Sequence, residues 1–147
     1  MTPIENDKTP VVLLAEDIPA EQQLVRRAIE KAGLNCELHI VNHGEEAIEF
    51  LYRRGEFTDA PRPDLFLLDL NMPRMDGRQV LEQVKSDPST SSIPIVILTT
   101  AQHDEDIARC YALGCNSYVV KPMDLHDFIH LLSVIGDYWF NIVMRSC

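Results

Sequence analysis

The sequence predicts an α/β fold in which five parallel strands form a single sheet with helices on both faces. Short apolar runs alternate along the chain with longer segments whose apolar residues recur at helical spacing. The run Leu65–Leu68 is continuously apolar, which is typical of a strand buried on both faces of a parallel sheet. Carboxylate, hydroxyl or lysine side chains stand at the ends of four of the five runs. Ligands of open α/β sheets bind beyond the carboxyl ends of the strands, so we expect a functional site at that edge.

The N-terminal part of the chain contains two predicted strands and two predicted helices. Val11–Ala15 is the first apolar run, and Pro19 begins a helix that ends at Gly33. Leu38–Val41 is the second strand. Glu45–Arg54 follows it as a helix with apolar residues on one side.

The middle of the chain continues this alternation. One glycine and two prolines make Gly55–Pro63 a surface loop, and the apolar run Leu65–Leu68 is the third strand. A loop rich in Asn, Pro, Asp and Gly leads from this strand to a helix over Gln79–Lys85. Ile95–Leu98 is the fourth strand, and Asp104–Leu113 is the helix that follows it.

The C-terminal part completes a doubly wound sheet. Ser117–Val120 is the fifth strand, and a last helix runs from about Asp124 to beyond Trp139. Right-handed crossovers and short connections favour the flavodoxin-like strand order 2-1-3-4-5. We expect one domain over residues 11–143, preceded by a flexible leader over residues 1–10. Because only a few residues follow the last helix, we expect no output domain.

The composition excludes some classes of partner. Thirteen basic and 23 acidic residues give a formal charge of −10. This balance argues against direct binding of nucleic acid, because phosphate contacts need clustered Lys and Arg. No apolar run approaches the roughly 20 residues of a membrane span. Four cysteines without a CxxC pair, and an N-terminus without the apolar core of a signal peptide, predict reduced thiols in a cytoplasmic protein.

Strands that would be neighbours in this sheet end in polar residues. These are Glu16 and Asp17 after the first strand, Asp69 after the third, Thr99 and Thr100 at the end of the fourth, and Lys121 after the fifth. Each has a structural explanation when taken alone: Asp17 could cap a helix, Asp69 could be a loop acid, and Lys121 could be solvated. Their occurrence at four adjacent strand ends favours a shared site.

The chemistry of such a site follows from its residue types. Crowded carboxylates raise one another's pKa unless a cation joins them, and oxygen ligands with retained waters suit Mg²⁺. A carboxylate can also accept a phosphoryl group as an acyl phosphate. A metal ion, an ammonium group and a hydroxyl donor would then stabilise the charge on the transferred group.

Several local motifs together give the sequence a family resemblance. They are Glu-Asp after the first strand, Leu-Leu-Asp-Leu-Asn-Met-Pro around Asp69, Met-Asp-Gly at residues 75–77, a threonine ending the fourth strand, and Tyr-Val-Val-Lys-Pro at residues 118–122. From Val11 to the last helix the chain resembles the response-regulator receiver domains of bacterial two-component signalling. The resemblance implies the receiver fold and a signalling module that catalyses only its own phosphorylation and dephosphorylation, not an enzyme acting on other substrates.

The resemblance also implies roles for individual residues. Asp69 would accept a phosphoryl group from a histidine kinase, and Lys121 would pair with the phosphoryl oxygens. Asp17, Asp69 and the backbone carbonyl of Asn71 would hold Mg²⁺, with Glu16 acting largely through water. The family usually has a cis peptide before the proline that follows this lysine, so the Lys121–Pro122 bond is expected to be cis.

Two further residues are implied to form the switch. Either Thr99 or Thr100 could supply the hydroxyl, and the family spacing selects Thr99, leaving Thr100 where the family prefers a small residue. Tyr118 matches the aromatic residue that rotates inward when this threonine moves. A tyrosine packed at the sheet edge is the structural alternative.

The last helix has two apolar stripes. The first suits the core and contains Phe128, Ile129, Leu132, Ile135, Trp139 and Ile142. The second contains Leu131, Val134 and Tyr138. A helix that is apolar on two faces buries the second against a partner, which predicts a homodimer through this helix, the preceding strand and the fourth helix. An irregular core stripe is the alternative.

A finer resemblance is to the response regulators of bacterial and cyanobacterial phytochrome kinases. It rests on the long loop at residues 54–63, the Leu-Thr-Thr ending of the fourth strand and the Tyr-Trp-Phe cluster at residues 138–140. It implies a light-responsive histidine kinase as the phosphodonor.

Two other functions share parts of this pattern. An aspartyl-phosphate phosphatase usually carries a second acid two residues after its nucleophile, where this chain has Asn71. A flavin- or nucleotide-binding domain would need a loop rich in Gly or Ser/Thr after the first strand, where this chain has Glu-Asp-Ile-Pro.

Overall fold

The computed structural model describes residues 9–100 and 102–143, with side chains described through residue 140. Within these residues five strands form one sheet in the order β2-β1-β3-β4-β5, and all neighbouring strands are parallel. The strands are β1 (Val11–Ala15), β2 (Glu37–Val41), β3 (Leu65–Leu68), β4 (Ile95–Thr99) and β5 (Ser117–Val120). The predicted class and strand order are confirmed. Most of the predicted leader, residues 1–8, lies outside the described residues.

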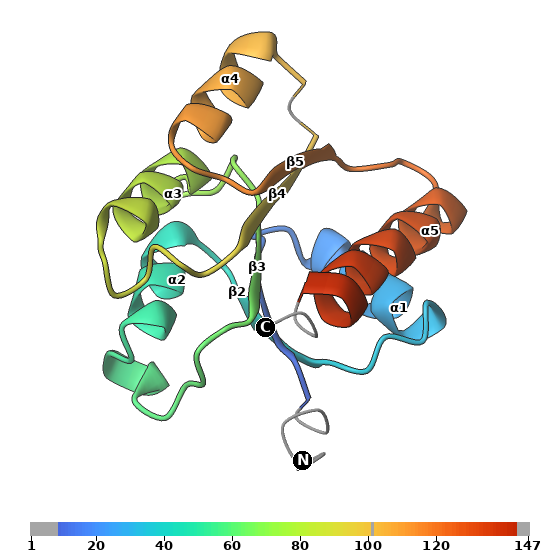
Figure 1. Cartoon of the computed structure of the whole chain (residues 1–147), viewed down its shortest axis with the longest axis horizontal. Helices are drawn as coiled ribbons and strands as arrows, with labels where there is room; N and C mark the ends of the chain where they lie inside the picture. The colour runs from blue at the N-terminus through green and yellow to red at the C-terminus, as the bar shows by residue number, and fades with distance from the viewer. Residues whose placement is uncertain (1–8, 101, 144–147) are drawn as a thin grey trace.

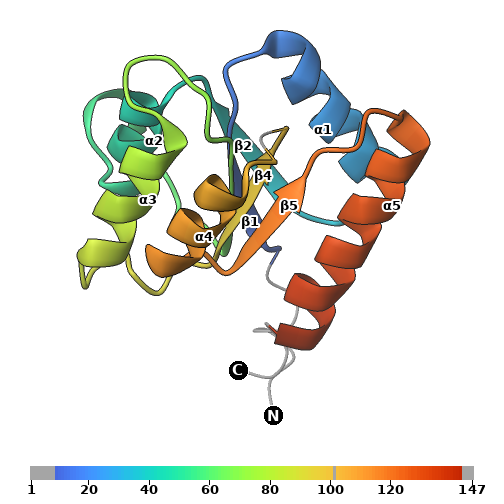
Figure 2. The ribbon, with the colours of Figure 1, turned by 90° about the horizontal axis from the view of Figure 1, so that it is seen from above.

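In the described part of the chain, five α-helices cover the two faces of the sheet. Helices α1 (Pro19–Lys31) and α5 (Leu125–Gly136) lie on one face. Helices α2 (Gly44–Leu51), α3 (Gly77–Ser86) and α4 (Asp104–Ala112) lie on the other (Figure 1). Seen from above, the edge strand β5 lies between α4 and α5 (Figure 2). An event at the carboxyl end of β5 is therefore close to both of these helices.

Strand β3 shows why a central strand of this sheet is continuously apolar. Phe66 and Leu68 pack in the cluster formed with α2, α3 and α4, whereas Leu65 and Leu67 pack in the cluster formed with α1 and α5. All four side chains are buried. Since successive side chains of a strand point to opposite faces, a strand covered on both sides must be apolar at every position.

Several helix ends differ from the predicted ones. Helix α2 ends at Leu51 rather than Arg54, because Arg53 adopts the left-handed conformation with φ of 54°. The expected loop after it contains one 3₁₀ turn, η2 (Gly55–Phe57). Helix α1 begins after Ile18, whose side chain makes no capping hydrogen bond, so the proposed cap role of Asp17 is wrong. The carboxylate of Asp17 is thus available for another purpose.

The last helix changes its hydrogen-bond pattern near its end. Helix α5 is α-helical to Gly136 and continues as a π-helical segment, η3 (Asp137–Val143). The first apolar stripe lies in the core as predicted, with Phe128, Leu132 and Trp139 buried. Ile142 lies outside the residues whose side chains are described.

Helix α3 begins two residues earlier than predicted and fixes the loop that follows β3. Asp76 and Gln79 form a reciprocal capping box, which starts the helix at Gly77. The Gly77 N–H donates to the carbonyl of Leu70 over 2.9 Å. A Cβ atom at position 77 would lie 2.2 Å from the backbone oxygen of Asp69. Only glycine permits this close contact between the helix and the strand end.

We expect Gly77→Ala to lower the free energy of unfolding by about 1–3 kcal/mol, because the methyl group forces the backbone after β3 to move. Urea denaturation followed by circular dichroism measures this change. Glu82→Ala, an exposed change on the same helix, should alter stability by less than about 0.5 kcal/mol. Equal stability of Gly77→Ala and the native protein would show that this contact relaxes without cost.

Candidate functional site

The predicted site residues converge at the carboxyl edge of the sheet. Asp69 follows β3, and its N–H donates to the carbonyl of Ala15, the last residue of β1, over 3.1 Å. The Lys121 N–H donates to the carbonyl of Thr99, the last residue of β4, over 2.8 Å. The parallel register therefore continues one residue beyond the strands and brings these residues together.

Three carboxylates gather at the centre of this site. Glu16, Asp17 and Asp69 each offer an oxygen, and these oxygens lie within 4.8 Å of one another. Glu16 and Asp69 are buried, and Asp17 is half-buried. The Leu70 N–H donates to Asp69 Oδ1 over 2.8 Å, which orients the Asp69 side chain. Carboxylates this close repel one another strongly unless a cation lies among them.

The donor set fits a divalent cation. Asp17 Oδ1 is buried and makes no hydrogen bond to any described residue. A buried carboxylate oxygen without a partner costs free energy, and coordination to a metal ion removes that cost. Hard oxygen ligands from two strand ends are the kind that Mg²⁺ and Mn²⁺ prefer. Asn71, two residues after Asp69, has an exposed side chain.

Lys121 supplies the positive charge of the site. Its Nζ contacts Glu16 Oε2 directly, lies 2.9 Å from Glu21 Oε1 and lies 3.8 Å from Asp69 Oδ2. Its side chain is only 5% exposed. Burial alone would lower the pKa of Lys121, but the neighbouring carboxylates outweigh this effect and raise it. The ammonium group is therefore charged at neutral pH.

Glu16 is the most buried of the acids. Burial raises its pKa to about 7, the charge of Asp69 adds to the increase, and the hydrogen bond with Lys121 opposes it. Its other oxygen, Oε1, accepts from the N–H of Ile18 over 3.2 Å. The resemblance implies that Glu16 acts largely through water; here it also binds Lys121 directly.

The structure places the two candidate threonines differently. Thr99 is fully buried at the end of β4, whereas Thr100 is exposed. Tyr118 on β5 is half-buried and packs against the cluster formed with α2, α3 and α4. Burial raises the pKa of its hydroxyl to about 12. The Lys121–Pro122 bond is trans, so the cis expectation is wrong. Because the isomers of an X–Pro bond differ by only about 0.5–1 kcal/mol, local surroundings decide between them.

Two pairs of residues at or near the site were not predicted. The first pair is Glu21 on α1 and Lys121, which are hydrogen-bonded although 100 positions separate them. The second pair is Arg78 on α3 and Asp106 on α4. Two guanidinium nitrogens of Arg78 lie 2.8 and 2.7 Å from Asp106 Oδ1. Both pairs join different helices or a helix and a strand end. Nothing in the local sequence pattern signals such contacts.

The fold and this site define a class of protein. A family model described as the response regulator receiver domain matches residues 12–133. The chain therefore belongs to the response regulator receiver family. Within the described ranges, no helix is both long enough and apolar enough to cross a lipid bilayer.

The chain is also similar to individual response regulators in sequence and in structure. The chain is 37% identical to the response regulator Rcp1 of Synechocystis sp., over 95% of each chain. The structure of the phosphorylated cyanobacterial phytochrome response regulator RcpA superimposes with a TM-score of 0.85 at 37% identity, covering 90% of this chain and 94% of that one. The Mn²⁺-bound form of Rcp1 superimposes with a TM-score of 0.84 at 38% identity, covering 90% and 96%.

Proposed function

We propose that this protein is a stand-alone response regulator that is switched by phosphorylation of Asp69. The observation that supports this most directly is the geometry around that carboxylate. Asp69 Oδ2 lies 3.8 Å from the Lys121 ammonium, and an oxygen of Asp17 without a hydrogen-bond partner belongs to the same acidic cluster. The proposed nucleophile, the proposed cation ligand and the ammonium group therefore lie together at one edge of the sheet.

The proposed reaction moves one phosphoryl group. A carboxylate oxygen of Asp69 forms a bond to phosphorus while the bond from phosphorus to the kinase histidine nitrogen breaks. The electron pair of that bond stays on the imidazole nitrogen. Lys121 stabilises the negative charge of the transferred group, and the Thr99 hydroxyl moves to bind one of its oxygens. The chain acts on its own side chain and not on a free substrate.

The cation proposed for this site is Mg²⁺. Asp17 and Asp69 would bind it together with the backbone carbonyl of Asn71, and Glu16 would act largely through water. When bound, the ion neutralises charge on the acidic cluster and on the phosphoryl oxygens. The orphaned oxygen of Asp17 supports this assignment.

The proposed phosphodonor is a histidine kinase of the phytochrome class. The names of the relatives support this: RcpA is described as a cyanobacterial phytochrome response regulator. The formal charge of −10 disfavours nucleic acid as a direct partner. Cys36, Cys110 and Cys115 are free thiols, which fits a cytoplasmic location.

Incubation with acetyl phosphate and Mg²⁺, followed by intact-mass measurement, tests the proposed function. We expect one phosphoryl group per chain, and none when EDTA removes the metal ion. Release of phosphate from many small esters, with no phosphorylated chain, would instead indicate a phosphatase. Co-purification of a flavin or nucleotide would indicate a binding domain.

The proposed output is a change on the α4-β5-α5 face, which we define by Tyr111, Val120, Met123, Val134 and Tyr138. These apolar side chains are all exposed, with Val134 at 52% and Tyr138 at 50%. Leu131, also predicted for the second stripe of the last helix, is half-buried. Tyr118 on β5 lies beneath α4, so its movement with Thr99 would change this face. We propose that the face binds a partner or a second copy of the chain.

We expect Val134→Glu to convert a homodimer to a monomer, because the charge would be buried against the second copy. Light scattering coupled to size-exclusion chromatography at micromolar concentration measures this. Gln23→Glu, an exposed change on α1, adds the same charge and should leave the dimer intact. A native protein that is monomeric with and without phosphorylation would contradict the dimer proposal.

A further inference from the structure

Glu21 is a fourth carboxylate at the site and comes from a different element. It lies in the first turn of α1, and its Oε1 accepts a hydrogen bond from Lys121 Nζ over 2.9 Å. Its side chain is 27% exposed, whereas Glu16 is fully buried. The ammonium group of Lys121 is thus held between one buried and one partly exposed carboxylate.

The distances show which acid holds the lysine in this state. Lys121 Nζ is 2.9 Å from Glu21 but 3.8 Å from Asp69, beyond the range of a hydrogen bond. An ammonium group has three donors, and Glu16 and Glu21 occupy two of them. The charge of the ammonium is thus shared between Glu16 and Glu21, and a group on Asp69 must compete with both for it.

Glu21 is the contact that can open. The second oxygen of Glu16 accepts from the backbone N–H of Ile18, and this side chain has no exposure to solvent. Releasing Glu16 would leave a buried carboxylate without its charged partner, which is costly. Glu21 is part-exposed, so water can solvate its carboxylate when Lys121 leaves.

We propose that Glu21 is a positioning residue that holds Lys121 away from Asp69 until a phosphoryl group competes for the lysine. This inference rests on the proposed phosphorylation of Asp69. We call this role a latch. Glu21 lowers the affinity of the site for a phosphoryl group and slows the phosphorylation of Asp69.

The test compares native protein with Glu21→Gln, which keeps the shape of the side chain and removes its charge. We expect Glu21→Gln to take a phosphoryl group from acetyl phosphate, with Mg²⁺ present, about 3- to 10-fold faster. We also expect about 3- to 10-fold tighter binding of beryllofluoride, a noncovalent mimic of the phosphoryl group, in ¹⁹F NMR titrations. The second measurement is an equilibrium and does not depend on turnover.

Two controls separate the latch from a general charge effect. Glu30→Gln removes the same charge from an exposed position on α1, and its rate should stay within about twofold of native. The gain in Glu21→Gln should persist in about 1 M KCl, where the Debye length is about 3 Å, because a direct contact is little screened. In the Lys121→Gln background, Glu21→Gln should have no effect, since Glu21 acts through Lys121.

Native rates and native beryllofluoride affinity in Glu21→Gln would overturn the latch while leaving phosphorylation of Asp69 intact. A gain that disappears in high salt would also overturn it, since long-range repulsion would then be the cause. A native chain that takes no phosphoryl group from acetyl phosphate would overturn the proposed function, and the latch with it.

Discussion

Asp69→Asn should take up no measurable phosphoryl group from acetyl phosphate, at least about 100-fold less than the native chain. The amide cannot act as the nucleophile that the carboxylate is, and no other acid of the cluster is equivalent. Glu16 is committed to Lys121 and to the backbone of Ile18. Intact mass after incubation with acetyl phosphate and Mg²⁺ measures the loss.

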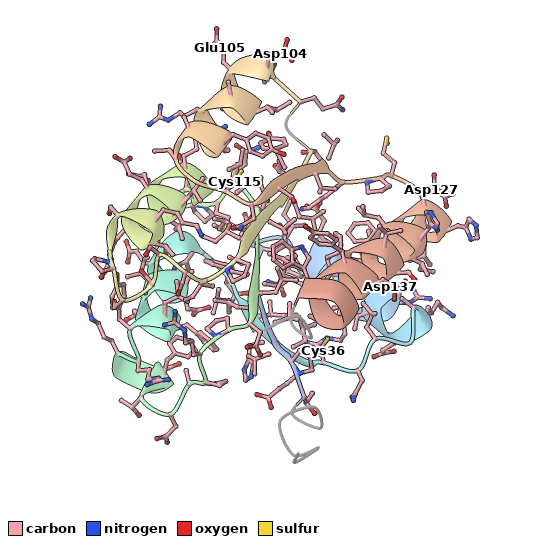
Figure 3. All side chains as sticks on the ribbon, viewed as in Figure 1. Cys36, Asp104, Glu105, Cys115, Asp127 and Asp137 are labelled. Atoms are coloured by element: carbon pink, nitrogen blue, oxygen red, sulfur yellow. The ribbon has the colours of Figure 1, made fainter. Side chains whose placement is uncertain are left out.

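Asp104→Asn is the matched control for this prediction. Asp104 is exposed in the first turn of α4, and Figure 3 shows its side chain pointing away from the molecule. The Asp104→Asn variant should be phosphorylated at the native rate. Full phosphorylation of Asp69→Asn would assign the acceptor to another residue and would contradict the proposed function.

Asp17→Asn should weaken divalent-cation binding by at least about 10- to 100-fold. Its carboxylate has a buried oxygen that bonds to no described residue, and we propose a cation as its partner. The amide removes a negative charge from the cluster as well as a ligand. Titration with Mn²⁺, followed by electron paramagnetic resonance of the free ion, measures the affinity without any phosphoryl transfer.

Thermal unfolding offers a second readout for Asp17→Asn. A ligand that binds only the folded protein raises the melting temperature, so Mg²⁺ should stabilise the native chain and not the variant. In EDTA the variant should be the more stable of the two, because it has lost a charge that the other acids repel. Asp59→Asn, in the exposed segment before β3, should behave like the native chain in both conditions. Native Mn²⁺ affinity in Asp17→Asn would contradict its role as a ligand.

The architecture and most of the site could be predicted from the sequence for a local reason. A strand covered on both faces must be apolar throughout, so runs such as Leu65–Leu68 are visible without any neighbour. The residue that follows such a run must lie at the carboxyl edge of a parallel sheet. Asp69 and Lys121 were found in this way, and the parallel register then brought them within 3.8 Å.

The tertiary structure decided what depends on contacts between distant elements. Packing between elements brings Lys121 to Glu21 and Arg78 to Asp106. It also determines that Asp17 is not the cap of α1. The end of α2 at Leu51 likewise depends on the left-handed backbone of Arg53.

The physical reason for this division is the range over which each signal acts. Apolar periodicity reflects burial, so it can be recognised within the sequence of a single strand or helix. A contact between two charged side chains depends on how two elements pack, so the sequence of either element alone does not predict it. The sequence by itself determined where the proposed phosphoryl acceptor should lie, and only the tertiary structure decided that Glu21 binds the lysine beside it.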